Sequence, residues 1–225
     1  MSNPRQLPDF FQYAMHILFA VVIGISFEIS SDIIIPIETI REHLVSAGIL
    51  ILGYFIVITS WIGYYLSIKK NPHKGRLGYM RFTLDIFTIY LFYYMINLSK
   101  MENQAYQHDV FLYLLPLTFA VYLIWDIVKY FEYKTKNQCA ELKHDRIHRI
   151  QITIDYLLWF VILAILYSYI IGLADKDTKL MEQIQISVII ISAILVYKYR
   201  DAKYYDSKRV KSKQRSSRRK NSKGF

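Results

Sequence analysis

The segment AGILILGYFIVITSWIGYYLSIKKNPHKGRLGYMR, residues 47–81, decides the fold class, because a long apolar run passes directly into a basic loop. The run from Ala47 to Ser67 has no charged residue and is long enough to cross the hydrocarbon core of a bilayer as a helix. The loop from Ile68 to Arg81 then holds five Lys or Arg residues and no acid. Loops that stay on the cytoplasmic side of a membrane are enriched in Lys and Arg. We therefore predict a membrane span followed by a cytoplasmic loop.

Five further apolar stretches have the length of a membrane span. The six predicted spans are residues 10–27, 47–67, 80–98, 110–131, 152–172 and 184–197. Backbone polar groups in lipid must be hydrogen-bonded internally, so runs of this length are expected to be helices. The predicted fold is an all-α integral membrane protein with six transmembrane helices in one domain, residues 1–200. A disordered basic tail, residues 201–225, is expected to follow.

Basic residues alternate between the two sides of these spans. Of the 28 Lys and Arg residues, 24 lie in the N-terminal arm, the second and fourth loops, or the C-terminal tail. The first, third and fifth loops hold only Arg41, Lys100, Lys176 and Lys179. This asymmetry predicts that both termini are cytoplasmic. The abundance of Ile, Lys, Asn and Tyr favours a bacterial inner (plasma) membrane, and a eukaryotic organelle is the alternative.

The first of these loops, residues 28–46, also has a pattern of its own. Apolar residues recur at helical spacing after Pro36, which favours a short helix on the outer membrane surface. A simple extension of the second span explains the same pattern.

The net charge of +10 is confined to the tail. Residues 198–225 carry 12 Lys or Arg and two Asp, whereas the rest of the chain is balanced. Such a segment beside a span is expected to bind anionic lipid headgroups, and nucleic acid or a protein partner is the alternative. The expected contact residues are Lys208, Arg209, Lys211, Lys213, Arg215, Arg218, Arg219 and Lys220.

Few ionisable side chains fall inside the predicted spans, and those few are the candidate site. Ionised groups in the hydrocarbon are costly and often functional. The candidates are Asp85, Asp126, Asp155 and His16, which share one layer near the cytoplasmic side, with Arg81 and Arg149 expected at its rim. One hypothesis is a cytoplasmic vestibule in which the carboxylates attract cations or relay protons.

The alternative hypothesis gives these acids a structural role. An Asp in the first turn of a helix satisfies free N–H groups, which would explain Asp85 and Asp155. Asp126 would pair with Lys129 one turn along the helix.

No recognised catalytic, cofactor or metal motif is present, so we expect no enzyme activity and no cofactor. The single cysteine, Cys139, excludes an intramolecular disulfide. The leading functional hypothesis is a small channel or transporter for an ion or small solute, acting as a homo-oligomer. The alternative is a membrane-anchored interaction or effector protein whose basic face and tail recruit a partner.

Overall fold

The computed structural model describes the backbone of residues 6–34, 43–73, 75–100, 104–134, 140–173 and 178–221. In these residues there is no strand, and six α-helices follow one another with short connections. The elements are α1 (Gln6–Ile34), α2 (Leu44–Lys70), α3 (Gly75–Asn97), the 3-10 turn η2 (Leu98–Lys100), α4 (Gln104–Glu132), α5 (Ala140–Leu173) and α6 (Thr178–Asn221).

Every one of the six helices contains a segment that is long and apolar enough to cross a membrane. These segments are Phe10–Ser31, Leu44–Lys69, Gly75–Lys100, Gln107–Glu132, Arg146–Gly172 and Lys179–Lys203. The prediction of an all-α chain with six helices that are long and apolar enough to span a membrane is therefore confirmed. The predicted surface helix after Pro36 falls largely outside the described residues.

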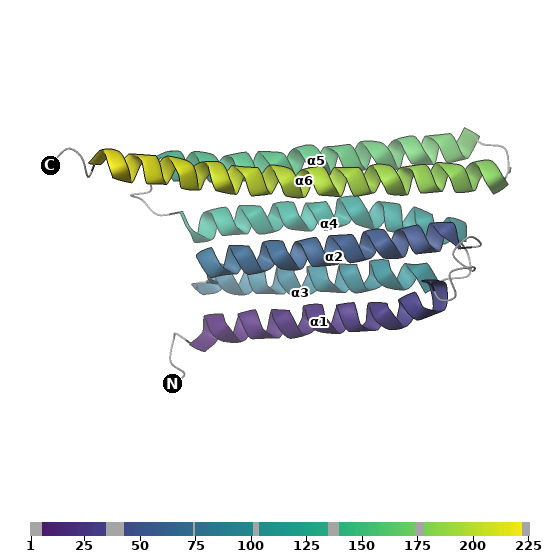
Figure 1. Cartoon of the computed structure of the whole chain (residues 1–225), viewed down its shortest axis with the longest axis horizontal. Coiled ribbons are helices and arrows are strands. Elements are labelled where there is room, and N and C mark those ends of the chain that lie inside the picture. Colours follow the sequence, from purple (N-terminus) through teal and green to yellow (C-terminus); the bar gives the residue numbers. More distant parts are fainter. Residues whose placement is uncertain are drawn as a thin grey trace.

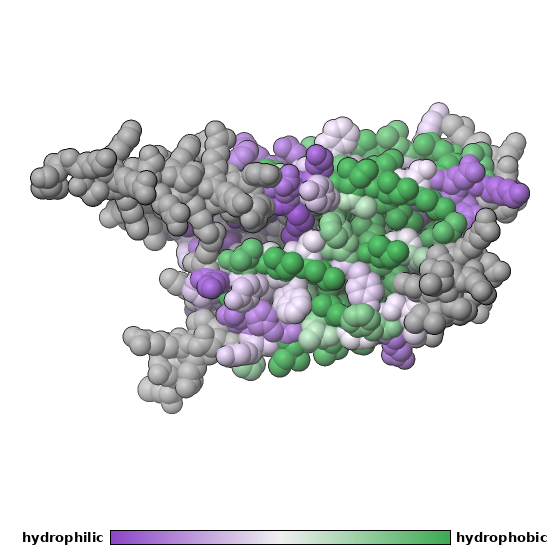
Figure 2. Space-filling view, in the orientation of Figure 1, coloured by the Kyte–Doolittle hydropathy of each residue, from purple (hydrophilic) through white to green (hydrophobic). Residues whose placement is uncertain are grey.

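The helices form a bundle in which the start of α1 and the end of α6 lie at the same end, on opposite edges (Figure 1). We call this end, which also carries the α2–α3 and α4–α5 connections, the basic end, and the opposite one the far end. Figure 2 shows apolar side chains forming a band across the bundle, with hydrophilic side chains on both sides of the band. This is the surface expected of a helical bundle whose middle section faces lipid and whose two ends face water.

Helix α2 is central to the packing, because it contacts α1, α3, α4 and α6. Helix α4 packs against α3 and α5, and α6 packs against α5 and α2. Towards the far end the interior is filled by large apolar side chains. Fully buried examples are Leu50, Leu52, Phe92, Met95, Ile96, Leu98, Phe111 and Leu115. Large apolar side chains therefore fill much of the far half, where Gln107, His108 and Gln185 are also buried.

The sixth helix is much longer than predicted. It runs without a break to Asn221, so the prediction of a disordered tail from residue 201 is wrong for residues 201–221. No Gly or Pro occurs between Leu173 and Lys223, so nothing in the sequence stops the helix. Extending an existing helix also avoids the cost of nucleation, and Lys, Arg and Gln are good helix formers.

Candidate functional site: a cationic cavity beside the central helix

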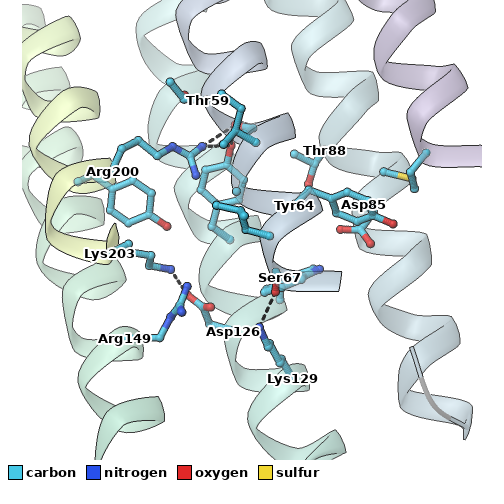
Figure 3. A pocket seen from close by; sticks show the side chains of 18 of the residues that line it. Thr59, Tyr64, Ser67, Asp85, Thr88, Asp126, Lys129, Arg149, Arg200 and Lys203 are labelled. Atoms are coloured by element: carbon cyan, nitrogen blue, oxygen red, sulfur yellow. Dashed lines mark hydrogen bonds and ion pairs between the residues drawn. The ribbon is translucent and has the colours of Figure 1, made fainter. Parts of the chain in front are cut away.

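A cavity of about 560 Å³ lies beside the central helix α2, in the half of the bundle nearest the basic end. Its volume is in the range of small-molecule sites. The lining residues are Met15, Phe19, Thr59, Ser60, Ile62, Gly63, Tyr64, Leu66, Ser67, Asn71, Asp85, Thr88, Tyr122, Trp125, Asp126, Lys129, Arg149, Tyr199, Arg200 and Lys203. All six helices contribute, and Figure 3 shows the polar side chains of α2 to α6 gathered around one space.

Basic side chains outnumber acidic ones in this lining. The four basic residues are Lys129, Arg149, Arg200 and Lys203, and the two acids are Asp85 and Asp126. The cavity therefore carries two more positive than negative charges when all six groups are ionised. Such a balance favours a bound anion over a bound cation, because an interior of low dielectric constant amplifies the attraction.

Arg200 of α6 reaches across the cavity to α2 and α4. Its Nη2 donates hydrogen bonds to Ser60 Oγ at 2.5 Å and to Tyr122 Oη at 3.1 Å (Figure 3). The guanidinium also lies over the rings of Tyr122 and Tyr199, at 5.3 and 5.2 Å from their centroids. Gly63 permits this approach, since a Cβ there would lie 3.3 Å from Arg200 Nη1. Arg200 is thus held by neutral groups only.

Lys129 of α4 is held in the same manner. Its Nζ donates to Ser67 Oγ at 2.5 Å and lies 4.9 Å from the centroid of the Trp125 ring. In the described part of the chain, neither Lys129 nor Arg200 forms an ion pair with a carboxylate. Two cations of this cavity consequently have no carboxylate within ion-pair distance.

Asp126 pairs with α6 and not with its own helix. Its Oδ2 accepts hydrogen bonds from Lys203 Nζ at 2.5 Å and from Thr153 Oγ1 at 2.7 Å. The predicted ion pair between Asp126 and Lys129 is therefore wrong. Because Lys203 comes from an adjacent helix, this ion pair joins α4 to α6, and the Thr153 hydrogen bond joins α4 to α5.

Below the cavity, towards the basic end, Arg81 and Glu132 form a buried ion pair between α3 and α4. The Arg81 side chain is fully buried, so Arg81 is not at an exposed rim as predicted. Just beyond the spans, Tyr133 donates its hydroxyl to the carbonyl of Pro72. Partial burial raises the pKa of the Tyr133 phenol.

Asp85 and Asp126 line the cavity, but the other two predicted pathway residues do not. The side chain of Asp155 is exposed on the outside of α5. His16 Nδ1 instead accepts a hydrogen bond from Trp61 Nε1 at 2.9 Å. Arg149, predicted for the rim, is a lining residue.

The capping hypothesis also fails for both of its acids. Helix α3 begins ten residues before Asp85, and α5 begins fifteen residues before Asp155, so neither lies in a first turn. Asp85 is buried, and its Oδ2 lies 3.4 Å from Nε2 of the buried His73. Because the helices extend past the membrane, acids near the predicted span starts are internal residues of these helices.

Sequence reasoning missed Arg200 and Lys203, because the predicted sixth span ended at Tyr197. The signal was the helical spacing of Ser192, Val196, Tyr199 and Lys203, which lie three to four residues apart on one face. Three of these side chains are buried and Lys203 lines the cavity. Following that face beyond the first charged residue would have placed both cations in the bundle.

The predicted tail contacts, Lys208 to Lys220, lie on the helical backbone of α6, and their side chains are outside the described part of the structure. Among the described residues, no group of three or more His, Cys, Asp or Glu could hold a metal ion. Comparison with protein-family models, with curated proteins and with solved structures finds no match.

Proposed function

We propose that this chain is a multi-pass membrane transporter for an anion, which it binds in the cationic cavity. The observation that carries the proposal is the pair Lys129 and Arg200, which face neutral hydroxyl groups inside a membrane-spanning bundle. Removing an ionised Lys or Arg from water without a neighbouring opposite charge is costly, although both residues lie three residues from the ends of their spans. A bound anion would offset this cost for both side chains.

The shape of the cavity supports transport over simple anchoring. It lies in the half of the bundle near the basic end, whereas large apolar residues such as Phe92 and Phe111 are buried in the far half. A binding site that is closed towards one side of the membrane is what alternating access requires. A permanently open channel would need a polar path through that core.

The sign of the charge separates this proposal from a cation pathway. The sequence hypothesis assigned the pathway to carboxylates, but in the cavity Asp126 is paired with Lys203. A cation entering here would meet Arg149 and Arg200 as well as Lys129. Repulsion by these side chains favours anions, and the two acids are better suited to hold the basic side chains in place.

The test is flux in liposomes that contain the purified protein, with radiolabelled phosphate, sulfate, glycerol 3-phosphate and small carboxylates on one side and Rb⁺ as the cation. The Lys129→Gln/Arg200→Gln variant keeps hydrogen-bond donors for the partner hydroxyls. It also leaves no acid unpaired, so it is expected to fold. Lys198→Gln is the matched control, because Lys198 is an exposed residue of the same helix and does not line the cavity.

We expect uptake of at least one anion that the double variant loses and Lys198→Gln retains. Each lost charged hydrogen bond is worth about 1.5–3 kcal/mol, so uptake at low concentration should fall by about 100-fold or more. Rb⁺ flux that survives the double substitution would contradict the proposal. Anion uptake that is equal in both variants would exclude these two side chains from the site.

A further inference from the structure

The cavity is not sealed from the outside of the bundle. Two of its lining residues on α2, Ile62 and Leu66, are 53% and 46% exposed. The cavity therefore reaches the surface of the bundle along one face of α2. At this level the surface lies within the membrane-spanning segment Leu44–Lys69, so the opening faces lipid.

The depth of the opening matches the boundary between acyl chains and headgroups. Ile62 and Leu66 lie seven and three residues before Lys69, the end of the span. At about 1.5 Å per residue this places them roughly 5–10 Å inside the bilayer. A lipid in the leaflet at the basic end would present its glycerol and upper acyl chains to this opening.

The interior combines an apolar wall with clustered cationic donors. Met15 and Phe19 of α1 give the lining an apolar wall. Among the described residues, Arg200 Nε and Tyr64 Oη are buried and lack a hydrogen-bond partner, as does Asp85 Oδ2 elsewhere in the lining. The two donors lie in a site that already holds Lys129 and the rest of the Arg200 guanidinium. Arg and Lys are the residues that proteins use to bind the oxygens of a phosphate group, and a guanidinium can donate more than one hydrogen bond to it.

We propose that the anion is the phosphate group of a lipid, an inference that rests on the proposed anion transport. The lipid enters sideways from the bilayer through the opening at Ile62 and Leu66. The phosphate binds to the Arg200 guanidinium beside Gly63, with Lys129 farther along the same cavity, and the acyl chains leave along the apolar face of α2. A soluble phosphate ester offers the same headgroup chemistry but makes no use of the lateral opening. The two sources are therefore distinguishable by blocking that opening.

The test measures binding of phosphatidate with a fluorescent acyl chain to the full-length protein in nanodiscs. Diacylglycerol with the same chain is the uncharged control lipid, and glycerol 3-phosphate is the soluble competitor. Ile62→Trp fills the opening, and Leu66→Trp is a second variant with the same purpose. Ile51→Trp is the matched control, because Ile51 is 62% exposed, lies on the same face of α2 three turns away and does not line the cavity.

We expect saturable phosphatidate binding that is about 10-fold or more tighter than diacylglycerol binding, since a charged hydrogen bond contributes at least this factor. Ile62→Trp and Leu66→Trp should weaken it by about 10-fold or more, while Ile51→Trp stays within about twofold of the wild type. Glycerol 3-phosphate should compete weakly. Lipid bound by the basic tail would be equal in all three Trp variants and cannot produce this difference.

Two results would overturn the inference in distinguishable ways. If glycerol 3-phosphate competes fully and the Trp variants at the opening bind like wild type, the anion comes from water; the lipid source is then excluded and anion transport stands. If Lys129→Gln/Arg200→Gln binds phosphatidate and glycerol 3-phosphate as the wild type does, both the lipid source and the anion site are excluded.

Discussion

The buried ion pair between Arg81 and Glu132 gives the most quantitative prediction, because both side chains are almost completely removed from solvent. The exposed fraction of the side chain is 0% for Arg81 and 2% for Glu132. Arg81 also lies 4.6 Å from the centroid of the Trp125 ring, so the pair supports one wall of the cavity. The proposed perturbation is Glu132→Gln, which preserves the volume of the side chain and removes only the negative charge.

Removing one partner of a buried ion pair costs about 3–5 kcal/mol, because the other charge is left without compensation. The amide oxygen introduced by Glu132→Gln can still accept one hydrogen bond from the guanidinium, so we expect the lower end of this range. About 3 kcal/mol corresponds to a decrease of about 100-fold or more in the folding equilibrium constant. By contrast, hydrogen bonds between neutral groups of membrane helices contribute about 0.6 kcal/mol on average. Removing one charge of this pair should therefore cost more than removing one hydrogen bond between neutral groups.

The assay is reversible unfolding in mixed micelles titrated with sodium dodecyl sulfate and followed by circular dichroism. Glu28→Gln is the matched control, since Glu28 is exposed on α1 and its substitution should change the free energy of unfolding by less than about 0.5 kcal/mol. The Arg81→Met/Glu132→Met variant removes both charges together. It should be more stable than Glu132→Gln alone, because no isolated charge remains. A Glu132→Gln variant as stable as Glu28→Gln would refute the burial of this pair.

Three further predictions concern other positions. Gly78→Ala should lower the thermal midpoint of unfolding, because a Cβ would lie 2.9 Å from a backbone carbon of the preceding loop, whereas Gly24→Ala has open space and should leave it nearly unchanged. Gly63→Val should displace the Arg200 guanidinium and weaken anion uptake by about 10-fold, the value of one charged hydrogen bond, as measured in liposomes. Deleting residues 206–225 should leave anion uptake intact. Because the tail carries the excess of basic residues, the deletion should reduce the attachment of nanodisc-embedded protein to anionic vesicles in a cosedimentation assay. Loss of uptake would favour the effector hypothesis.

The fold was predictable because the bilayer constrains the sequence strongly. A run such as residues 47–67 can adopt few structures in lipid, and each of its apolar residues supports the same prediction of a membrane-spanning helix. The end of the sixth span was not predictable by that rule. Arg200 and Lys203 look like the start of a solvated tail when hydropathy alone is averaged. Only their partners, Tyr122 and Asp126 on α4, make burial acceptable, and those contacts are remote in sequence.

The candidate site was only partly predictable for a related reason. Asp126 was identified because an acid in a span is unusual, but its partner could not be derived from its own helix. Asp155 was placed in the same layer because its depth is similar. Both faces of α5 are apolar, so the sequence does not indicate that Thr153 and Phe160 face inward while Asp155 and Trp159 are exposed. Depth can be read from one helix, whereas orientation depends on its neighbours.

The most direct test of the cationic cavity needs no knowledge of the ligand. In a Cys139→Ser background, which removes the single native cysteine, Ser67→Cys places a thiol on the cavity wall beside Lys129. The measurement is the ratio of its reaction rates with an anionic and a cationic methanethiosulfonate reagent, divided by the same ratio for a free thiol in solution. The ionisation of the thiol itself cancels in this ratio.

Charged clefts have electrostatic potentials of several kT. If the potential in this cavity is only about 1 RT per unit charge, the normalised rate ratio for two reagents that differ by two charges should be about seven. We expect a normalised ratio of about seven or more, which falls towards one when Lys129→Gln and Arg200→Gln are added. A normalised ratio of one or less in the Ser67→Cys protein would contradict a cationic cavity, and with it the proposed transport of an anion.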